Sequence, residues 1–172
     1  MDENAPRLER LYSTRALGRI KTEELEQNEP LLAALSKLTQ ATDWRIAMEA
    51  VLALGKSQGE RAQGALLEAL GHRSFHVRQA AALNLKPAHQ SPLGDSLRAS
   101  VETLARDPSA SVRVAGILTA AHILGDKAEK HIREAAGHED PRMRYGALAA
   151  ALASSPTLGL ELASRALEDS DL

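Results

Sequence analysis

Apolar side chains recur along the chain at the spacing of one face of an α-helix, in segments separated by short polar stretches. Small and aliphatic residues form such patterns at 62–70, 97–106 and 130–136. Each of these segments is followed, after a few residues, by a second helical pattern of the same kind. The chain is therefore predicted to form a series of helical hairpins.

The residues between the paired segments are typical of helix ends. Gly71 and Gly137 are placed to end the first helix of their hairpins. Asp107-Pro108 and Asp140-Pro141 each put a carboxylate that can cap a helix before a proline suited to the first helical turn. We expect these residues to form the turns inside the hairpins.

The second segments begin with an arginine in the same register. An apolar residue precedes each arginine, and Ala or Gly stands two positions after it. The arginines are 33, 35 and 31 residues apart, which is the period of a stacked helical repeat. The four copies are Trp44-Arg45-Ile46-Ala47, Val77-Arg78-Gln79-Ala80, Val112-Arg113-Val114-Ala115 and Met143-Arg144-Tyr145-Gly146.

Composition favours the same fold. Apolar residues make up 44% of the 172 residues but aromatic residues only 2%, so the core must consist of Ala, Leu, Val and Ile. Ala and Leu are strong helix formers, whereas a sheet would be enriched in β-branched and aromatic residues. The fold class is predicted to be all-α.

The period, the Asp-Pro turns and the Val-Arg-x-Ala opening of the second helix resemble HEAT repeats, especially the short repeats also found in phycobilin lyases. The resemblance covers about residues 30–155. It implies a right-handed α-solenoid of about four HEAT-like helical hairpins with terminal capping helices. The expected repeats are 30–58, 59–90, 91–125 and 126–155, after an N-terminal capping helix and connector (1–29) and before a C-terminal half-repeat or cap (156–172).

Charge and motifs exclude several function classes. The net charge is −2 with both signs interspersed, which gives no overall attraction to nucleic acid or to an anionic membrane. The chain has no Cys, no basic-apolar leader and no apolar run of membrane-spanning length, so we expect a cytoplasmic protein. His72 and His76 are four residues apart but lack a third ligand at an obvious spacing, and we predict no metal, cofactor or catalytic residue.

Two interpretations of the arginine register stay open. In HEAT-like families an arginine here usually bonds the turn of its own or a neighbouring repeat, which implies Asp43, Asp107 and Asp140 as partners. The alternative is a basic stripe that binds phosphate or acidic peptides. His72 and His138 share one turn position, six residues before the arginine, where Asp107 stands in the third repeat. A polar turn residue explains this equivalence without a ligand.

The leading hypothesis is a protein-protein interaction scaffold whose concave face binds another protein or peptide. A DNA-binding protein of the alkylated-base glycosylase type, with Trp44 and Asp43 in the groove, is the first alternative. A lyase-like or chaperone-like helper for a tetrapyrrole protein is the second, and the oligomeric state stays open. The residues expected on the binding face are Arg45, Arg78, Gln79, Leu83, Arg113, Val114, Leu118, Arg144, Tyr145 and Leu148.

Overall fold

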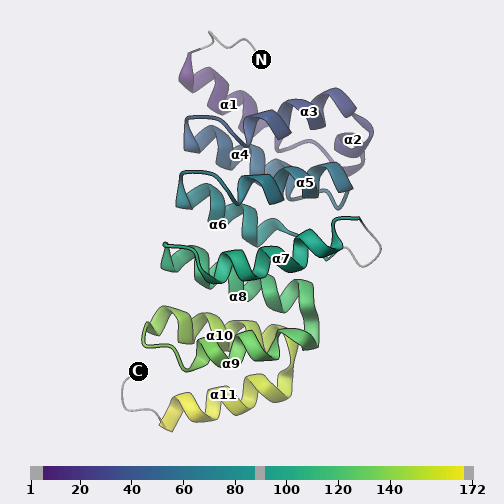
Figure 1. Cartoon of the computed structure of the whole chain (residues 1–172). Helices are drawn as coiled ribbons and strands as arrows, with labels where there is room; N and C mark the ends of the chain where they lie inside the picture. Colours follow the sequence, from purple (N-terminus) through teal and green to yellow (C-terminus); the bar gives the residue numbers. More distant parts are fainter. Residues whose placement is uncertain (1–5, 88–91, 169–172) are drawn as a thin grey trace. The chain divides into compact units, whose positions relative to one another are not determined.

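The computed structural model describes residues 6–87 and 92–168, and every regular element in these two ranges is a helix. The all-α prediction is therefore confirmed for this part of the chain. The chain forms two compact units, Met1–Leu93 and Gly94–Leu172. Figure 1 shows the helices of both units in chain order.

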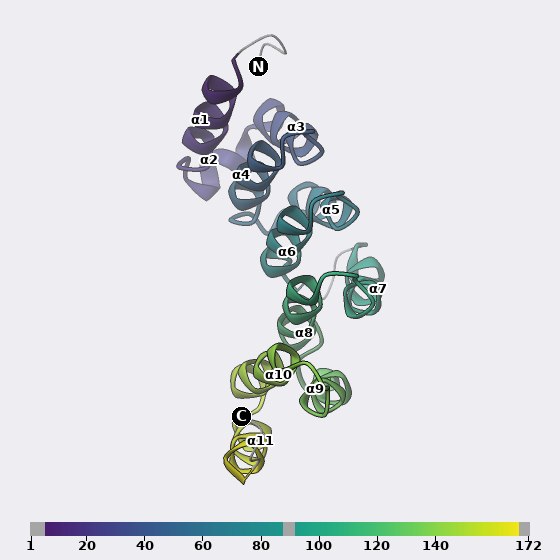
Figure 2. The ribbon, with the colours of Figure 1, turned by 90° about the vertical axis from the view of Figure 1, so that its left-hand side faces the viewer.

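Unit 1 contains two helical hairpins and two further helices, α1 and α2, which pack on the first hairpin. Helix α4 lies at its centre, because it contacts α1, α3, α5 and α6. The hairpins α3–α4 and α5–α6 follow one another in Figure 2. The helices are α1 (Arg7–Leu17), α2 (Thr22–Gln27), α3 (Glu29–Leu38), α4 (Trp44–Leu54), α5 (Glu60–Ala69) and α6 (Phe75–Asn84).

Unit 2 contains two further hairpins, α7–α8 and α9–α10, followed by a single helix (Figure 2). Helix α8 packs against α7, α9 and α10, and α10 packs against α8, α9 and α11. The elements are α7 (Gly94–Ala105), α8 (Ala110–Leu124), the 3-10 helix η1 (Gly125–Ala128), α9 (Glu129–Ala136), α10 (Pro141–Ser154) and α11 (Pro156–Glu168).

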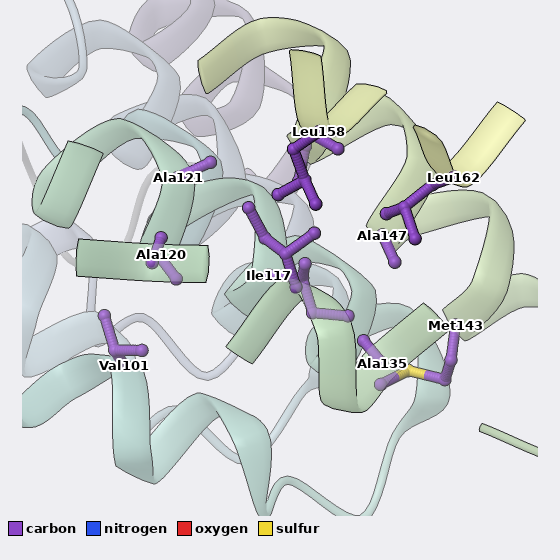
Figure 3. Packing of buried hydrophobic residues seen from close by; sticks show 13 residues of the cluster. Val101, Ile117, Ala120, Ala121, Ala135, Met143, Ala147, Leu158 and Leu162 are labelled. Carbon is purple, nitrogen blue, oxygen red and sulfur yellow. The ribbon is translucent and has the colours of Figure 1, made fainter. Parts of the chain in front are cut away.

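The core of unit 2 is built from small and aliphatic side chains, as the composition predicts. Figure 3 shows Ile117 between Val101 of α7 and the apolar residues of α10 and α11. Besides Met143, this cluster consists of Ala, Val, Leu and Ile, and it contains no aromatic residue. Without rings to fill gaps, the helices must approach closely, and alanine allows this at little cost in side-chain entropy.

Glycines lie at close contacts between helices of unit 2. A Cβ added to Gly116 of α8 would lie 2.7 Å from the Cβ of Leu104 in α7. A Cβ added to Gly146 of α10 would lie 2.9 Å from Cγ1 of Val114 in α8. Gly146 is the small residue two positions after the repeat arginine. At this position it allows α10, the second helix of its hairpin, to pack closely on α8, the second helix of the preceding hairpin.

Replacing Gly116 with alanine is expected to destabilise unit 2. Overpacking against Leu104 costs about 1–3 kcal/mol, which exceeds the helix-propensity gain of at most ~1 kcal/mol. Gly64 of α5 is the matched control, because no atom lies within 4 Å of its added Cβ. Gly64→Ala should raise the free energy of unfolding by roughly 0.5–1 kcal/mol in urea denaturation. If Gly116→Ala were stabilising to the same extent, the close approach of α7 and α8 would be wrong.

Two local predictions are corrected and one is confirmed. The segment 1–29, expected to hold one capping helix and a connector, contains a second helix, α2. Glu23 and Glu24 lie in its first turn, where acidic side chains interact favourably with the helix dipole. Asp140 caps α10 as predicted, accepting from the backbone N–H of Arg142 at 2.9 Å. Asp107 does not cap α8, because it accepts from the N–H of Ser109 at 2.8 Å and forms a turn, so that α8 begins only at Ala110. The repeat boundaries stay predictions.

Candidate functional site

Three of the four repeat arginines make the same pair of hydrogen bonds. Each half-buried guanidinium donates through Nη1 to the carbonyl oxygens five and six residues earlier, in the turn of its own hairpin. The pairs are Arg78 with His72 (2.9 Å) and Arg73 (3.2 Å), Arg113 with Asp107 (2.9 Å) and Pro108 (3.2 Å), and Arg144 with His138 (3.2 Å) and Glu139 (2.9 Å).

These bonds confirm that the arginine holds the turn. The turn leaves carbonyls outside any helical ladder, and a guanidinium can bond two of them at once. The carboxylates of Asp43 and Asp140, expected as partners, pair instead with Arg7 and Arg142. Arg142 donates to both carboxylate oxygens and lowers the pKa of Asp140 to about 2. The hydrogen bond and the charge of Arg7 likewise hold the pKa of Asp43 below its usual value.

The turn position shared by two histidines and an aspartate has one role. Nδ1 of His72 accepts from the N–H of Ser74 at 3.0 Å, and Nδ1 of His138 accepts from the N–H of Asp140 at 2.9 Å. Asp107 uses its carboxylate in the same way. The neutral His72 ring must therefore carry its proton on Nε2, which donates to the carbonyl of Ala41 at 3.2 Å in the preceding turn. The imidazole thus ties two turns together.

Arg45 departs from the register. Among the described residues it bonds no turn carbonyl, and its guanidinium lies over the Trp44 ring, 4.8 Å from the centroid. Trp44 also stacks on His76 at 4.5 Å. Trp44 is only half-buried, whereas Val77 and Val112 at the same position are fully buried. Trp44 therefore does not share the buried environment of these two valines, and its indole packs on the exposed imidazole of His76.

The residues expected on the binding face fall into two groups. Val114, Leu118 and Leu148 are half-buried and pack against the core of unit 2. They contribute to packing between helices. Leu83 and Tyr145 are 48% and 73% exposed. Gln79 is half-buried and Arg45 is exposed.

A cavity of about 320 Å³ in unit 2 brings Arg144, Tyr145 and Leu148 together. It lies among α9, α10 and α11, with apolar side chains in its wall and three arginines around it. Tyr145 is its exposed aromatic residue. We call it the α10 groove; besides Gly137, its other lining residues are Arg133, Ala136, Leu162, Arg165 and Ala166.

Ion pairs hold two of these arginines in place. Arg133 of α9 donates through both Nη atoms to the carboxylate of Glu161 in α11, each at 2.9 Å. Nη2 of Arg165 lies 3.0 Å from Oε1 of the same glutamate. These contacts hold the pKa of Glu161 below its usual value, chiefly through Arg133. The groove is lined by three arginines and no acidic residue, but Glu161 and Glu129, which both accept from Arg133, offset part of this positive charge.

Our sequence analysis missed Arg133, Leu162 and Arg165. The apolar spacing of Leu158 and Leu162 marks the face of α11 that packs on the unit. This spacing does not show that Arg165, one turn further along α11, lines a groove together with residues of α10. The position of α11 had to be known first.

A comparison with family models gives a match to HEAT repeats over residues 2–86. The chain is a HEAT-like repeat protein. The matched range contains α1 to α6, and the arginine register carries the same hairpin into unit 2. Its fold is thus of the all-α solenoid class. No curated protein matches the chain in sequence.

HEAT repeats commonly serve as protein-interaction scaffolds and are generally not catalytic. None of the helices in residues 6–87 and 92–168 is long and apolar enough to cross a membrane.

Proposed function

We propose that this chain is a non-catalytic adaptor of the cytoplasm that binds a segment of another protein in the α10 groove. The observation that carries the proposal is the exposed Tyr145 beside an apolar cavity surrounded by arginines. Tyr and Arg are the residue types that most often anchor protein interfaces, especially beside a pocket that excludes water. Three residues of the predicted binding face, Arg144, Tyr145 and Leu148, meet there.

The chemistry of the groove specifies the kind of segment. Its volume of about 320 Å³ accommodates one or two apolar side chains against Leu148 and Leu162. Arg133 already bonds Glu161 and Glu129, whereas Arg165 contacts Glu161 through Nη2 alone, so we expect Arg165 to bind a carboxylate of the partner. The expected partner segment therefore carries an apolar side chain next to Asp or Glu.

Substitution of Tyr145 tests this proposal. Tyr145→Ala should weaken partner binding at least about 30-fold, the loss typical of an interface hot spot. Arg165→Glu should have a similar effect by placing a carboxylate opposite the acidic segment. Tyr12→Ala is the matched control, because Tyr12 is 63% exposed on α1 and lies outside the groove.

The measurement is affinity capture by the tagged chain, followed by titration of each retained protein against the purified variants. A partner that loses affinity with Tyr145→Ala and Arg165→Glu but binds Tyr12→Ala like the parent chain supports the proposal. Equal binding to all three variants would refute it.

The nucleic-acid alternative rests on the arginine column, and the structure gives it little support. Arg78, Arg113 and Arg144 already donate to turn carbonyls. Asp43, the carboxylate expected beside Trp44, is paired with Arg7 and caps α4. The tetrapyrrole alternative has no residue of its own in the described chain and stays a family analogy.

A further inference from the structure

We propose that unit 1 binds an oxyanion, a carboxylate or a phosphate monoester group, in a pocket formed by α1, α3, α4 and the turn before α4. The site is independent of the α10 groove. It consists of two neighbouring cavities of about 430 and 490 Å³ that share Arg10, Thr42, Asp43 and Ile46. We call it the Arg10 pocket.

The Arg10 pocket has an excess of positive charge. Arg7, Arg10 and Arg45 line the first cavity, and Arg10 and Lys37 line the second. Asp43 is the one acidic residue among the residues that line the two cavities. Its carboxylate is occupied, because it pairs with Arg7 and accepts from the N–H of Arg45 at 3.1 Å.

Arg10 supplies a donor that the protein does not satisfy. Its Nε is enclosed and has no hydrogen-bond partner within residues 6–87 and 92–168. A buried N–H without an acceptor costs free energy, and this cost is greater when the group is charged. An oxyanion in the pocket would lie beside this guanidinium and provide a counter-charge to it.

Arg45 is the second group that we expect to bind the anion, because it lacks the turn bonds of the other repeat arginines. The other three arginines of the register are held by turn carbonyls, whereas Arg45 is exposed at the pocket and rests on Trp44. Stacking on the indole fixes the guanidinium without using its N–H donors. Trp44 is in turn held by the His76 ring. A planar fork fixed in this way matches the oxygens of a carboxylate or phosphate.

Helix α4 begins at Trp44, so its start lies in the wall of the first cavity, where the carboxylate of Asp43 already caps it. The arginines and Lys37, rather than the helix end, therefore supply the attraction to an anion.

Titration of the purified chain with inorganic phosphate and, separately, with acetate tests the site, with sodium chloride keeping the ionic strength constant. Trp44 is the only tryptophan of the sequence, so its fluorescence reports on the pocket, and calorimetry gives an independent readout. We expect saturable binding of at least one anion. Saturation by phosphate alone identifies a phosphate group as the ligand, and saturation by acetate identifies a carboxylate.

Variants locate the binding. Arg10→Gln and Arg45→Gln should each weaken the affinity at least 10-fold by calorimetry. Arg61→Gln should bind like the parent chain, because Arg61 is exposed in the same unit, pairs with Glu29 and lines neither cavity. If Arg10→Gln fails to fold by circular dichroism, Arg45→Gln decides alone, since Arg45 is exposed and bonds no turn carbonyl. The absence of saturable binding by either anion, or undiminished binding by the Arg45 variant, would overturn the proposal.

Discussion

Leu66→Ala is expected to lower the free energy of unfolding by about 2–5 kcal/mol, the largest stability effect of any substitution proposed for this protein. Leu66 is fully buried in α5, a helix that contacts α3, α4 and α6. The buried hydrophobic residues of the described chain include no aromatic residue, and leucine contributes the largest share of their volume. Removal of three carbon atoms leaves a cavity that the surrounding helices can close only in part.

Urea denaturation followed by circular dichroism measures this loss. The midpoint should fall while the slope of the transition stays unchanged, which shows that stability rather than compactness has altered. Leu52→Ala is the matched control, since Leu52 is 43% exposed on α4, and should cost less than about 1 kcal/mol. Equal losses in the two variants would contradict the burial assigned to α5.

Arg113→Ala is expected to lower the free energy of unfolding by about 1.5–3 kcal/mol, the range for hydrogen bonds that involve a charged group. The substitution removes both donors to the turn carbonyls of Asp107 and Pro108 and leaves these oxygens without that partner. Arg45 occupies the same repeat position but does not make these turn bonds. Arg45→Ala should therefore lower the free energy of unfolding by less than about 0.5 kcal/mol.

The comparison of these two variants separates the roles of the arginine column. Thermal and urea unfolding should show a clear loss for Arg113→Ala and little change for Arg45→Ala. A large loss in both would mean that Arg45 also holds its turn in solution, and that it is not available to an oxyanion. A small loss of stability in both variants would contradict the explanation that the repeat arginines recur because they hold the turns.

The fold was predictable because its signals are local. The arginine register and the turn position of His72 and His138 follow from fixed distances within one hairpin, so sequence spacing specifies them directly. The different behaviour of Arg45 was not predictable in this way. It depends on Trp44, whose indole stacks on His76 of the next hairpin, and on Arg7, which engages Asp43.

The candidate site was predictable only in part. Val114 and Tyr145 occupy the same repeat position, yet Val114 packs on Gly146 while Tyr145 is 73% exposed beside α11. Periodicity specifies which face of a helix a residue occupies but not what packs on that face. Arg133 and Arg165 line the groove and both pair with Glu161. The pair between Arg133 of α9 and Glu161 of α11 links two different helices, and spacing within one hairpin does not reveal it.

Photo-crosslinking from position 145 tests most directly whether this repeat protein is an adaptor that binds through the α10 groove. Tyr145 is replaced by p-benzoylphenylalanine, the chain is irradiated in extract of its source cells, and the crosslinked peptides are identified by mass spectrometry. The same replacement at Tyr12, an exposed tyrosine of unit 1, is the control. We expect crosslinks from position 145 to a peptide with an apolar residue next to Asp or Glu, and their loss when Arg165→Glu is added. Crosslinks from position 12 but not from position 145, or none from either, would contradict the account.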